Sequence, residues 1–302
     1  MKEVYTLEDL TSRDVLDKGA DKPARLAVIG HPIAHSASPR MHQAALDAMG
    51  IDVRYIRIDV EPGQVAEAFA RMRGLGFVGC NVTVPHKFEA MQHCAVSPGA
   101  QALGAVNTLC FGGEDPCGYN TDGPGFTNAI QHDFGVPLAS LKVVILGAGG
   151  GAGQAIATQC VMLGVPKLVM VNRSLDKLGP LLDRMKSINS TSEVVALSFD
   201  DSALAEHCHD AELLVNTSSV GLKIGDPSII PISCLKPPHF VYDTIYQPAI
   251  TPLLAMANLV GCRTSNGMSM LLHQGVLAFQ YWFPQTQPLI PMGKALGYSA
   301  GA

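Results

Sequence analysis

A glycine-rich turn is the feature of this chain that most restricts its fold. Five of the seven positions from Gly147 to Gly153 are glycine, inside a long stretch without a charged residue, Val143 to Pro166. A stretch of that length suggests a membrane-spanning helix, but glycines at this density break such a helix. The pattern instead predicts a buried strand at Lys142–Leu146, a glycine turn, and a helix from about Gly151 to Leu163.

A glycine turn between a strand and a helix is typical of dinucleotide binding. Glycines permit the tight turn and let backbone N–H groups at the helix start approach a pyrophosphate. The next strand ends at Asn172-Arg173-Ser174, with Lys177 beyond, where NAD-binding proteins usually carry Asp or Glu for the ribose 2′-hydroxyl. Arg173 suits a 2′-phosphate instead. We therefore expect NADP rather than NAD, the alternative being that Arg173 and Lys177 are ordinary solvated positions.

The composition excludes several classes of protein. Apolar types make up 47 % of the 302 residues and charged types 16 %, against about 25 % charged in an average soluble chain, which excludes a disordered protein. A formal net charge of −5 and 6 % aromatic residues argue against nucleic-acid binding. Met1–Asp21 lacks the apolar core of a signal peptide, and the eight cysteines form no C-x-x-C pair, which fits reduced thiols in the cytoplasm.

Strands alternating with helices predict an α/β protein with parallel sheets, and the length allows two domains. Ser38 as N-cap, Pro39 in the first turn and Gly50 as the stop delimit one helix. Gly123, Pro124, Gly125, Gly135 and Pro137 place a domain boundary near 124–136. We divide the chain into a polar extension at 1–24, a first domain at 25–124 with 268–302, and a second domain at 125–267.

The remaining elements expected from hydrophobic pattern and turn residues are placed as follows. Before the boundary they are a short helix at Leu7–Lys18, strands at Arg25–Ile29, Val53–Val60, Phe77–Val84 and Ala105–Phe111, and a helix at Gln64–Arg73. After it they are strands at Lys167–Val171, Val194–Leu197, Glu212–Asn216 and Phe240–Tyr242, and a helix at Met268–Phe283 that we expect to return to the first domain.

Polar clusters follow several strands of the first half, where open α/β sheets bind ligands. They offer hydroxyls, amides, one ammonium and one carboxylate, which suits a small polyhydroxylated substrate. The motifs are His-Ser-x-Ser-Pro at 35–39, Asn-Val-Thr-Val-Pro-x-Lys at 81–87, Gly-Ala-Val-Asn-Thr at 104–108 and Asn-Thr-Asp-Gly at 120–123. In this order, and followed by the glycine turn, Asn172-Arg173-Ser174, Tyr242-Asp243 with Tyr246, and Asn266-Gly267 with Gln274, they resemble the shikimate dehydrogenase family over residues 25–285.

The resemblance implies an N-terminal α/β substrate domain, a C-terminal Rossmann-like dinucleotide-binding domain and a cleft between them. It implies NADPH-dependent reduction of 3-dehydroshikimate to shikimate, a step toward the aromatic amino acids. Carried over by motif, Lys87 and Asp122 are the catalytic pair. A carbonyl that accepts hydride develops alkoxide charge and needs a proton, and a lysine oriented by an aspartate supplies both a cation and an acid. In the alternative, Lys87 and Asp122 form only a structural ion pair.

The other site residues are implied by the same resemblance. Those expected to bind substrate are Ser36, Ser38, Asn81, Thr83, Asn107, Tyr246 and Gln274. Those expected to bind the cofactor are Gly147, Ala148, Gly149, Gly150, Gly151, Ala152, Asn172, Arg173, Ser174, Lys177, Thr217, Gly267 and Met270.

Two alternatives of function stay open. One is a quinate/shikimate dehydrogenase using NAD or NADP, although serine rather than threonine at Ser38 favours shikimate in the resemblance. The other is a non-catalytic sensor of a shikimate-pathway metabolite, which predicts loss of the acid/base pair or of the glycine turn. We expect a small-molecule substrate, no nucleic acid, no membrane and either a monomer or a homodimer. We expect no metal, because His207-Cys208-His209 has no second pair at ligand spacing.

Overall fold

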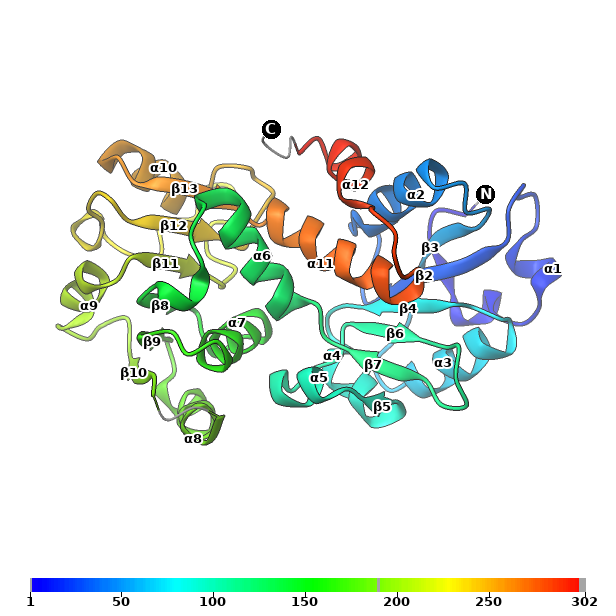
Figure 1. Ribbon diagram of the computed structural model, residues 1–302, viewed down its shortest axis with the longest axis horizontal. Coiled ribbons are helices and arrows are strands. Elements are labelled where there is room, and N and C mark those ends of the chain that lie inside the picture. The colour runs from blue at the N-terminus through cyan, green and yellow to red at the C-terminus, as the bar shows by residue number, and fades with distance from the viewer. Residues whose placement is uncertain (1, 189–190, 299–302) are drawn as a thin grey trace. The chain divides into compact units, whose positions relative to one another are not determined.

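The computed structural model describes residues 2–188 and 191–298, which group into two compact units (Figure 1). The first unit takes the chain up to residue 121 together with the residues from 272 onward, and the second takes residues 122–271. The sequence placed these limits at 124 and 268. The polar extension supplies β1 (Tyr5–Thr6), a short 3₁₀ turn and α1 (Arg13–Leu16) to the first unit, in place of the single helix expected there.

The sheet of the first unit is mixed, and the expectation of parallel strands alone was wrong for it. Its seven strands lie in the order β1-β3-β2-β4-β6-β7-β5, with β4/β6 and β6/β7 antiparallel. The six residues between β6 and β7 are too few for the helical crossover that parallel neighbours require. The strands beyond β1 are β2 (Ala24–Gly30), β3 (Arg54–Asp59), β4 (Gly79–Val82), β5 (Ala95–Val96), β6 (Thr108–Cys110) and β7 (Cys117–Tyr119).

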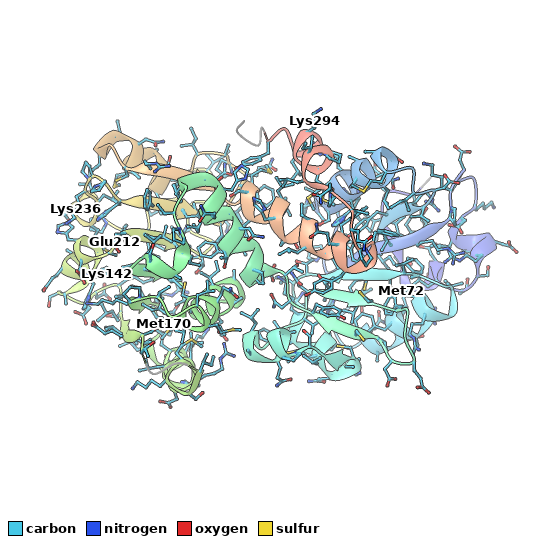
Figure 2. All side chains as sticks on the ribbon, in the orientation of Figure 1. Met72, Lys142, Met170, Glu212, Lys236 and Lys294 are labelled. Atoms are coloured by element: carbon cyan, nitrogen blue, oxygen red, sulfur yellow. The ribbon has the colours of Figure 1, made fainter. Side chains whose placement is uncertain are left out.

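Helices cover both faces of this sheet. On one face, a buried cluster joins strand residues such as Ile29 and Ile58 to Met72 of α3, whose side chain lies in the interior (Figure 2). On the other face, α12 packs along α2 (Figure 1). The helices are α2 (Ser38–Ala48), α3 (Val65–Gly74), α4 (Lys87–Ala90), α5 (Pro98–Leu103), the part of α11 (Met268–Trp282) from Leu272 onward, and α12 (Leu289–Leu296).

The start of α2 differs from the expectation. The helix begins at Ser38 itself, with Ala37 in the N-cap position and no side-chain cap. The Ser36 hydroxyl instead accepts the backbone N–H of Ser38, at 3.3 Å. This hydrogen bond satisfies one of the backbone N–H groups at the helix start, which have no partner within the helix.

The six-stranded sheet of the second unit is parallel throughout and has the strand order of a Rossmann fold. The order β10-β9-β8-β11-β12-β13 is 3-2-1-4-5-6 when its strands are numbered along the chain. Five of the strands lie at expected positions, and β13 was missed because its polar sequence carries no apolar signal. The strands are β8 (Val143–Leu146), β9 (Lys167–Val171), β10 (Glu193–Leu197), β11 (Leu213–Asn216), β12 (Phe240–Asp243) and β13 (Arg263–Asn266).

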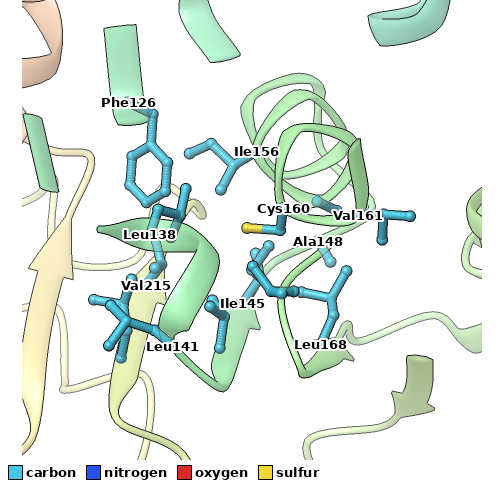
Figure 3. Close-up of a cluster of buried hydrophobic side chains, with 14 of the residues drawn as sticks. Phe126, Leu138, Leu141, Ile145, Ala148, Ile156, Cys160, Val161, Leu168 and Val215 are labelled. Atoms are coloured by element: carbon cyan, nitrogen blue, oxygen red, sulfur yellow. The ribbon is translucent and has the colours of Figure 1, made fainter. Parts of the chain in front are cut away.

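Alternate residues of these strands face opposite cores, as the period of two requires. Ile145 and Met170 belong to the cluster under α6, α7 and α8 (Figures 2 and 3), whereas Val144 and Val169 belong to the one under α9 and α10. Burial on both faces explains the near-continuous apolar strands. The helices are α6 (Asp122–Phe134), α7 (Gly151–Met162), α8 (Gly179–Ile188), α9 (Leu204–Asp210) and α10 (Pro252–Val260).

Helix α6 occupies the stretch near 124–136 where the sequence placed the domain boundary, and the sequence did not predict this helix. Pro124 lies in the first turn, where its missing N–H costs no hydrogen bond. A Cβ on Gly123 would lie 2.6 Å from the Gln159 side-chain oxygen of α7, so this glycine permits close helix packing. Gly135, with φ +73°, ends the helix.

The uncharged stretch of the sequence forms β8, the glycine turn and α7. Among residues 2–188 and 191–298, no helix is both long and apolar enough to cross a bilayer.

Candidate active site

The loop that follows β2 carries Ser36 and Ser38, and an arginine of β3 fixes its backbone. Arg57 of β3 donates its Nε and Nη2 hydrogens to the carbonyl oxygen of Ser36, at 3.1 and 2.7 Å. Ser36 is half-buried and Ser38 is 8 % exposed. A bidentate guanidinium contact fixes the backbone that presents these two hydroxyls. Sequence reasoning missed Arg57, because it lies among the alternating residues of a strand and carries no signal of its own.

Asn81 and Thr83 mark the end of β4. The Tyr55 hydroxyl donates to Asn81 Oδ1 at 2.7 Å, and Asn81 Nδ2 donates to the carbonyl of Asn107 at 3.3 Å and to Thr108 Oγ1 at 3.2 Å. Thr83 is half-buried, and its methyl group packs on Gly30, where a Cβ would lie only 2.6 Å from it. Gly30 is therefore needed for the ends of β2 and β4 to approach.

Asn107 is the centre of a buried hydrogen-bond network. Its Oδ1 accepts the backbone N–H of Thr121 at 2.8 Å and the Thr108 hydroxyl at 3.0 Å, while its Nδ2 donates to Thr121 Oγ1 at 3.0 Å. Asn120 donates to the carbonyl of Ala105 at 2.9 Å. Asn120 and Thr121 thus join the motifs at 81–87 and 104–108 within the first unit through these hydrogen bonds.

The expected catalytic residues lie at the starts of two helices. Lys87 is the first residue of α4, and its carbonyl accepts the N–H of Val106 at 3.0 Å. Asp122 opens α6, directly after Thr121. Both side chains are half-buried. His86 is fully buried, with Nε2 donating to the carbonyl of Val60 at 2.6 Å, which suits a wall of the site and leaves this nitrogen unable to act as a base.

The glycine turn of the second unit separates inward-facing glycines from outward-facing ones. A Cβ on Gly149 would lie 2.7 Å from Asn172 Nδ2, and one on Gly153 would lie 2.6 Å from the carbonyl of Gly147. Gly147 itself has φ +88°, a conformation that favours glycine. By contrast, nothing lies within 4 Å of a Cβ on Gly151, and no side chain caps α7, whose N-cap is Gly150.

This arrangement fits a pyrophosphate, because uncapped N–H groups at the start of α7 lie beside exposed backbone. Gly150, Gly151 and Ala152 are exposed, whereas the methyl group of Ala148 is buried in the core, so Ala148 can offer only its backbone. Thr217, after β11, donates its hydroxyl to the carbonyl of Leu146 at 3.0 Å. The turn therefore lies at the switch point between β8 and β11, where open sheets bind dinucleotides.

The segment after β9 carries the exposed cations. Asn172 Nδ2 donates to the carbonyl of Ser174 at 2.9 Å, which holds this turn against Gly149. Arg173 and Lys177 are exposed, and Ser174 is half-buried. The residue before Arg173, at the end of β9, is Asn172. NAD-binding proteins usually carry a carboxylate near this position, which would repel a 2′-phosphate, and here an amide takes its place.

A second network, which the sequence did not reveal, fixes the turn before Met270. Tyr242 Oη accepts the N–H of Met270 at 3.1 Å and lies 3.0 Å from Ser269 Oγ, and Ser269 donates to Asp133 Oδ2 at 2.6 Å. Gly267 is buried where a Cβ would overlap the carbonyl of Thr244. Met270 packs on the core cluster below, and Tyr246 is half-buried.

Two residues of the segment His207-Cys208-His209, which has the residue types of a metal site, have other contacts or are buried. Cys208 is buried, and His209 Nε2 donates to the carbonyl of Ser233 at 2.7 Å. Within residues 2–188 and 191–298, no group of three or more His, Cys, Asp or Glu side chains is placed to hold a metal ion.

Comparisons with known proteins agree on one family. Residues 28–109 match the family model described as the shikimate dehydrogenase substrate binding domain. The shikimate dehydrogenase (NADP(+)) of Moorella thermoacetica is 38 % identical over 281 residues, which cover 92 % of this chain and 94 % of that protein.

Solved structures extend the likeness to the fold. Shikimate 5-dehydrogenase from Thermus thermophilus, in complex with NADP(H) and shikimate, is 34 % identical with a TM-score of 0.79, over 91 % of this chain and 98 % of that one. Quinate dehydrogenase from Corynebacterium glutamicum, in complex with NAD, is 29 % identical with a TM-score of 0.82, over 91 % and 99 %.

Proposed function

Because this chain belongs to the shikimate dehydrogenase family, we propose that it catalyses the reversible reduction of 3-dehydroshikimate to shikimate with NADPH. The observation that carries the proposal is the 38 % sequence identity with a curated relative of that activity, over 92 % of this chain. The protein is then an NADP-dependent oxidoreductase acting on a CH–OH group, in the biosynthesis of aromatic amino acids.

The residues of the second unit fit the cofactor. The uncapped start of α7 and the exposed backbone of Gly150–Ala152 offer donors to the pyrophosphate, and Arg173 with Lys177 offers charge to the 2′-phosphate. Asn172, Ser174, Thr217, Gly267 and Met270 complete the proposed cofactor site. NADPH, when bound, supplies the hydride.

Lys87 and Asp122 carry the proton chemistry in this proposal. As hydride reaches the carbonyl carbon, the π electron pair moves to the oxygen, and the Lys87 ammonium donates a proton that completes the hydroxyl. Asp122 orients that ammonium. Ser36 and Ser38 bind the carboxylate, while Asn81, Thr83, Asn107, Tyr246 and Gln274 bind the remaining groups of the substrate.

Two assays together test the activity and the sensor alternative. Purified protein mixed with 3-dehydroshikimate and NADPH is expected to form one shikimate, identified by chromatography, for each NADPH oxidised. Calorimetry is expected to show that Lys87→Ala still binds shikimate while its turnover is lost. A wild type that binds shikimate but transfers hydride to neither NADP nor NAD would establish a sensor.

A second candidate is oxidation of quinate with NAD, which the likeness to the Corynebacterium enzyme favours. The amide at Asn172 and the cation at Arg173 oppose it, because an NAD site usually places a carboxylate there.

The finer assignments of partner and place are also proposals. All eight cysteines are free thiols, which suits the reducing cytoplasm. We propose a cytoplasmic enzyme that works as a monomer or a homodimer, to be distinguished by light scattering coupled to gel filtration.

A further inference from the structure

Tyr55 of β3 lies beneath the proposed substrate residues of the first unit and has no role in the mechanism above. Its hydroxyl donates to Asn81 Oδ1 at 2.7 Å, and the Ser38 hydroxyl is a second hydrogen-bonding neighbour of the same phenol. The side chain is 5 % exposed, so solvent does not compete for this contact. Burial also raises the pKa of Tyr55 far above its ordinary value, which keeps the proton on the phenol.

A chain of hydrogen bonds continues from Tyr55 through two amides and two threonine hydroxyls, and the Thr121 hydroxyl also donates back to Asn107 Oδ1 at 3.2 Å. Asn81 Nδ2 donates to Thr108 Oγ1, the Thr108 hydroxyl donates to Asn107 Oδ1, and Asn107 Nδ2 donates to Thr121 Oγ1. A flipped Asn81 amide would turn Oδ1 toward the carbonyl oxygen of Asn107, which Nδ2 now meets at 3.3 Å. The donor from Tyr55 and the acceptor from Asn107 therefore select one orientation of Asn81.

This arrangement of donors and acceptors determines which hydrogen-bonding groups of each amide remain for a ligand. A primary amide has two N–H donors and two acceptor lone pairs. Asn81 uses Nδ2 on the Asn107 carbonyl and Thr108, and one lone pair on Tyr55, so it retains an acceptor. Asn107 uses both lone pairs of Oδ1 on Thr121 and Thr108, and one N–H on Thr121, so it retains a donor.

A stack of rings holds Tyr55 in this position. The His42 ring lies 4.5 Å from the Tyr55 ring with an interplanar angle of 6°, and Phe279 stacks on the other side of His42 at 6.1 Å. Burial lowers the pKa of His42 to about 3, with the neighbouring Asn81 amide acting weakly in the opposite direction, so the ring is neutral. The stacked rings hold the Tyr55 ring in place, and the Tyr55 hydroxyl makes the hydrogen bond to Asn81.

Building on the proposed function, we propose that Tyr55 is a positioning residue for substrate recognition. It orients Asn81 and, through Thr108, Asn107, so that the site offers one amide oxygen to a hydroxyl of the substrate and one amide N–H to an oxygen of the substrate.

The test removes the hydroxyl and keeps the ring. Tyr55→Phe is expected to raise KM for shikimate about tenfold, the effect of one oriented hydrogen bond, with kcat within about twofold and KM for NADP unchanged. Tyr5→Phe is the matched control, because Tyr5 is equally buried and its Oη accepts from Arg54 Nη1 at 3.1 Å, and this variant is expected to keep wild-type values. Unchanged KM for shikimate in Tyr55→Phe would overturn the inference.

A double-mutant cycle separates positioning from stability. In an Asn81→Ala background, the Tyr55→Phe substitution is expected to change KM for shikimate no further. An undiminished effect in that background, or an equal rise in both Michaelis constants together with a lowered melting temperature, would indicate a structural role and overturn the inference. A wild type without shikimate turnover overturns the proposed function and this inference with it, whereas an active wild type beside an unaffected Tyr55→Phe overturns the inference alone.

Discussion

Replacement of Gly153 in the glycine turn by alanine is expected to destabilise the second unit and to weaken the binding of NADPH. In Gly153→Ala, the new Cβ would lie 2.6 Å from the carbonyl oxygen of Gly147, 2.7 Å from Ala148 Cα and 2.8 Å from Thr217 Oγ1. Two of these three atoms are backbone of the turn, so a side-chain rotation cannot relieve the overlap. Because carbon atoms prefer separations of about 3.5–4.0 Å, the turn and the start of α7 must move apart by roughly 1 Å.

The energetic cost has two opposing parts. Overpacking costs about 1–3 kcal/mol, and replacing glycine by alanine within a helix returns about 0.5–1 kcal/mol. At the middle of both ranges the free energy of unfolding should fall by about 1 kcal/mol, which lowers the melting temperature of a unit of this size by about 2–4 °C. The same displacement moves the N–H groups proposed to bind the pyrophosphate, and we expect KM for NADPH to rise about tenfold.

Thermal unfolding and steady-state kinetics measure both effects. Gly179→Ala is the control, because Gly179 also begins a helix of the second unit and nothing lies within 4 Å of its Cβ. That variant is expected to match or slightly exceed wild-type stability with unchanged kinetics. If Gly153→Ala is as stable as Gly179→Ala and keeps the KM of the wild type, the tight contact between turn and helix does not exist as described.

Three further predictions concern single side chains. Lys87→Ala should lower kcat by about 10²–10⁴-fold with shikimate binding retained, measured by kinetics and calorimetry, and near-normal turnover would exclude Lys87 as the acid. Arg173→Ala should raise KM for NADPH about tenfold or more and leave KM for NADH little changed, whereas equal effects on both would place the 2′-phosphate elsewhere. Burial lowers the pKa of His42 to about 3, so below pH 6.5 the unfolded chain takes up a proton that the folded chain does not. Wild-type stability should therefore fall by about 1 kcal/mol more than that of His42→Phe between about pH 7.5 and 5.5 in urea titrations, and parallel losses would contradict this assignment.

Local patterns were enough to predict the elements that carry the proposed cofactor site. Apolar strand, glycine turn and helix at 142–163 lie as the sequence indicated, because each is determined by residues within a few positions. Helix α6 was missed because Gly123 and Pro124 are loop residues in most contexts. Here Gly123 lies against Gln159, a residue of another helix, and this contact cannot be read from the local sequence.

The network under Asn81 could not be predicted for a related reason. Tyr55 is one position of an alternating strand, and its partner lies 26 residues away on β4. The sheet order β3-β2-β4 puts another strand between them. Only the strand order shows that the phenol and the amide share a face, and strand order is not a local property of the sequence. The family resemblance identified Asn81 and Asn107 as substrate-binding residues, but it did not show which atom of each amide is available to the substrate.

The proposed reduction of 3-dehydroshikimate with NADPH is reversible, so oxidation of shikimate provides its sharpest test. We would measure kcat/KM for shikimate and for quinate, each with NADP and with NAD, under one set of conditions. The pair of shikimate with NADP is expected to exceed the other three by at least about tenfold, since each missing charged or hydrogen-bonded contact costs about 1.5–3 kcal/mol. A highest kcat/KM for quinate with NAD would contradict the account.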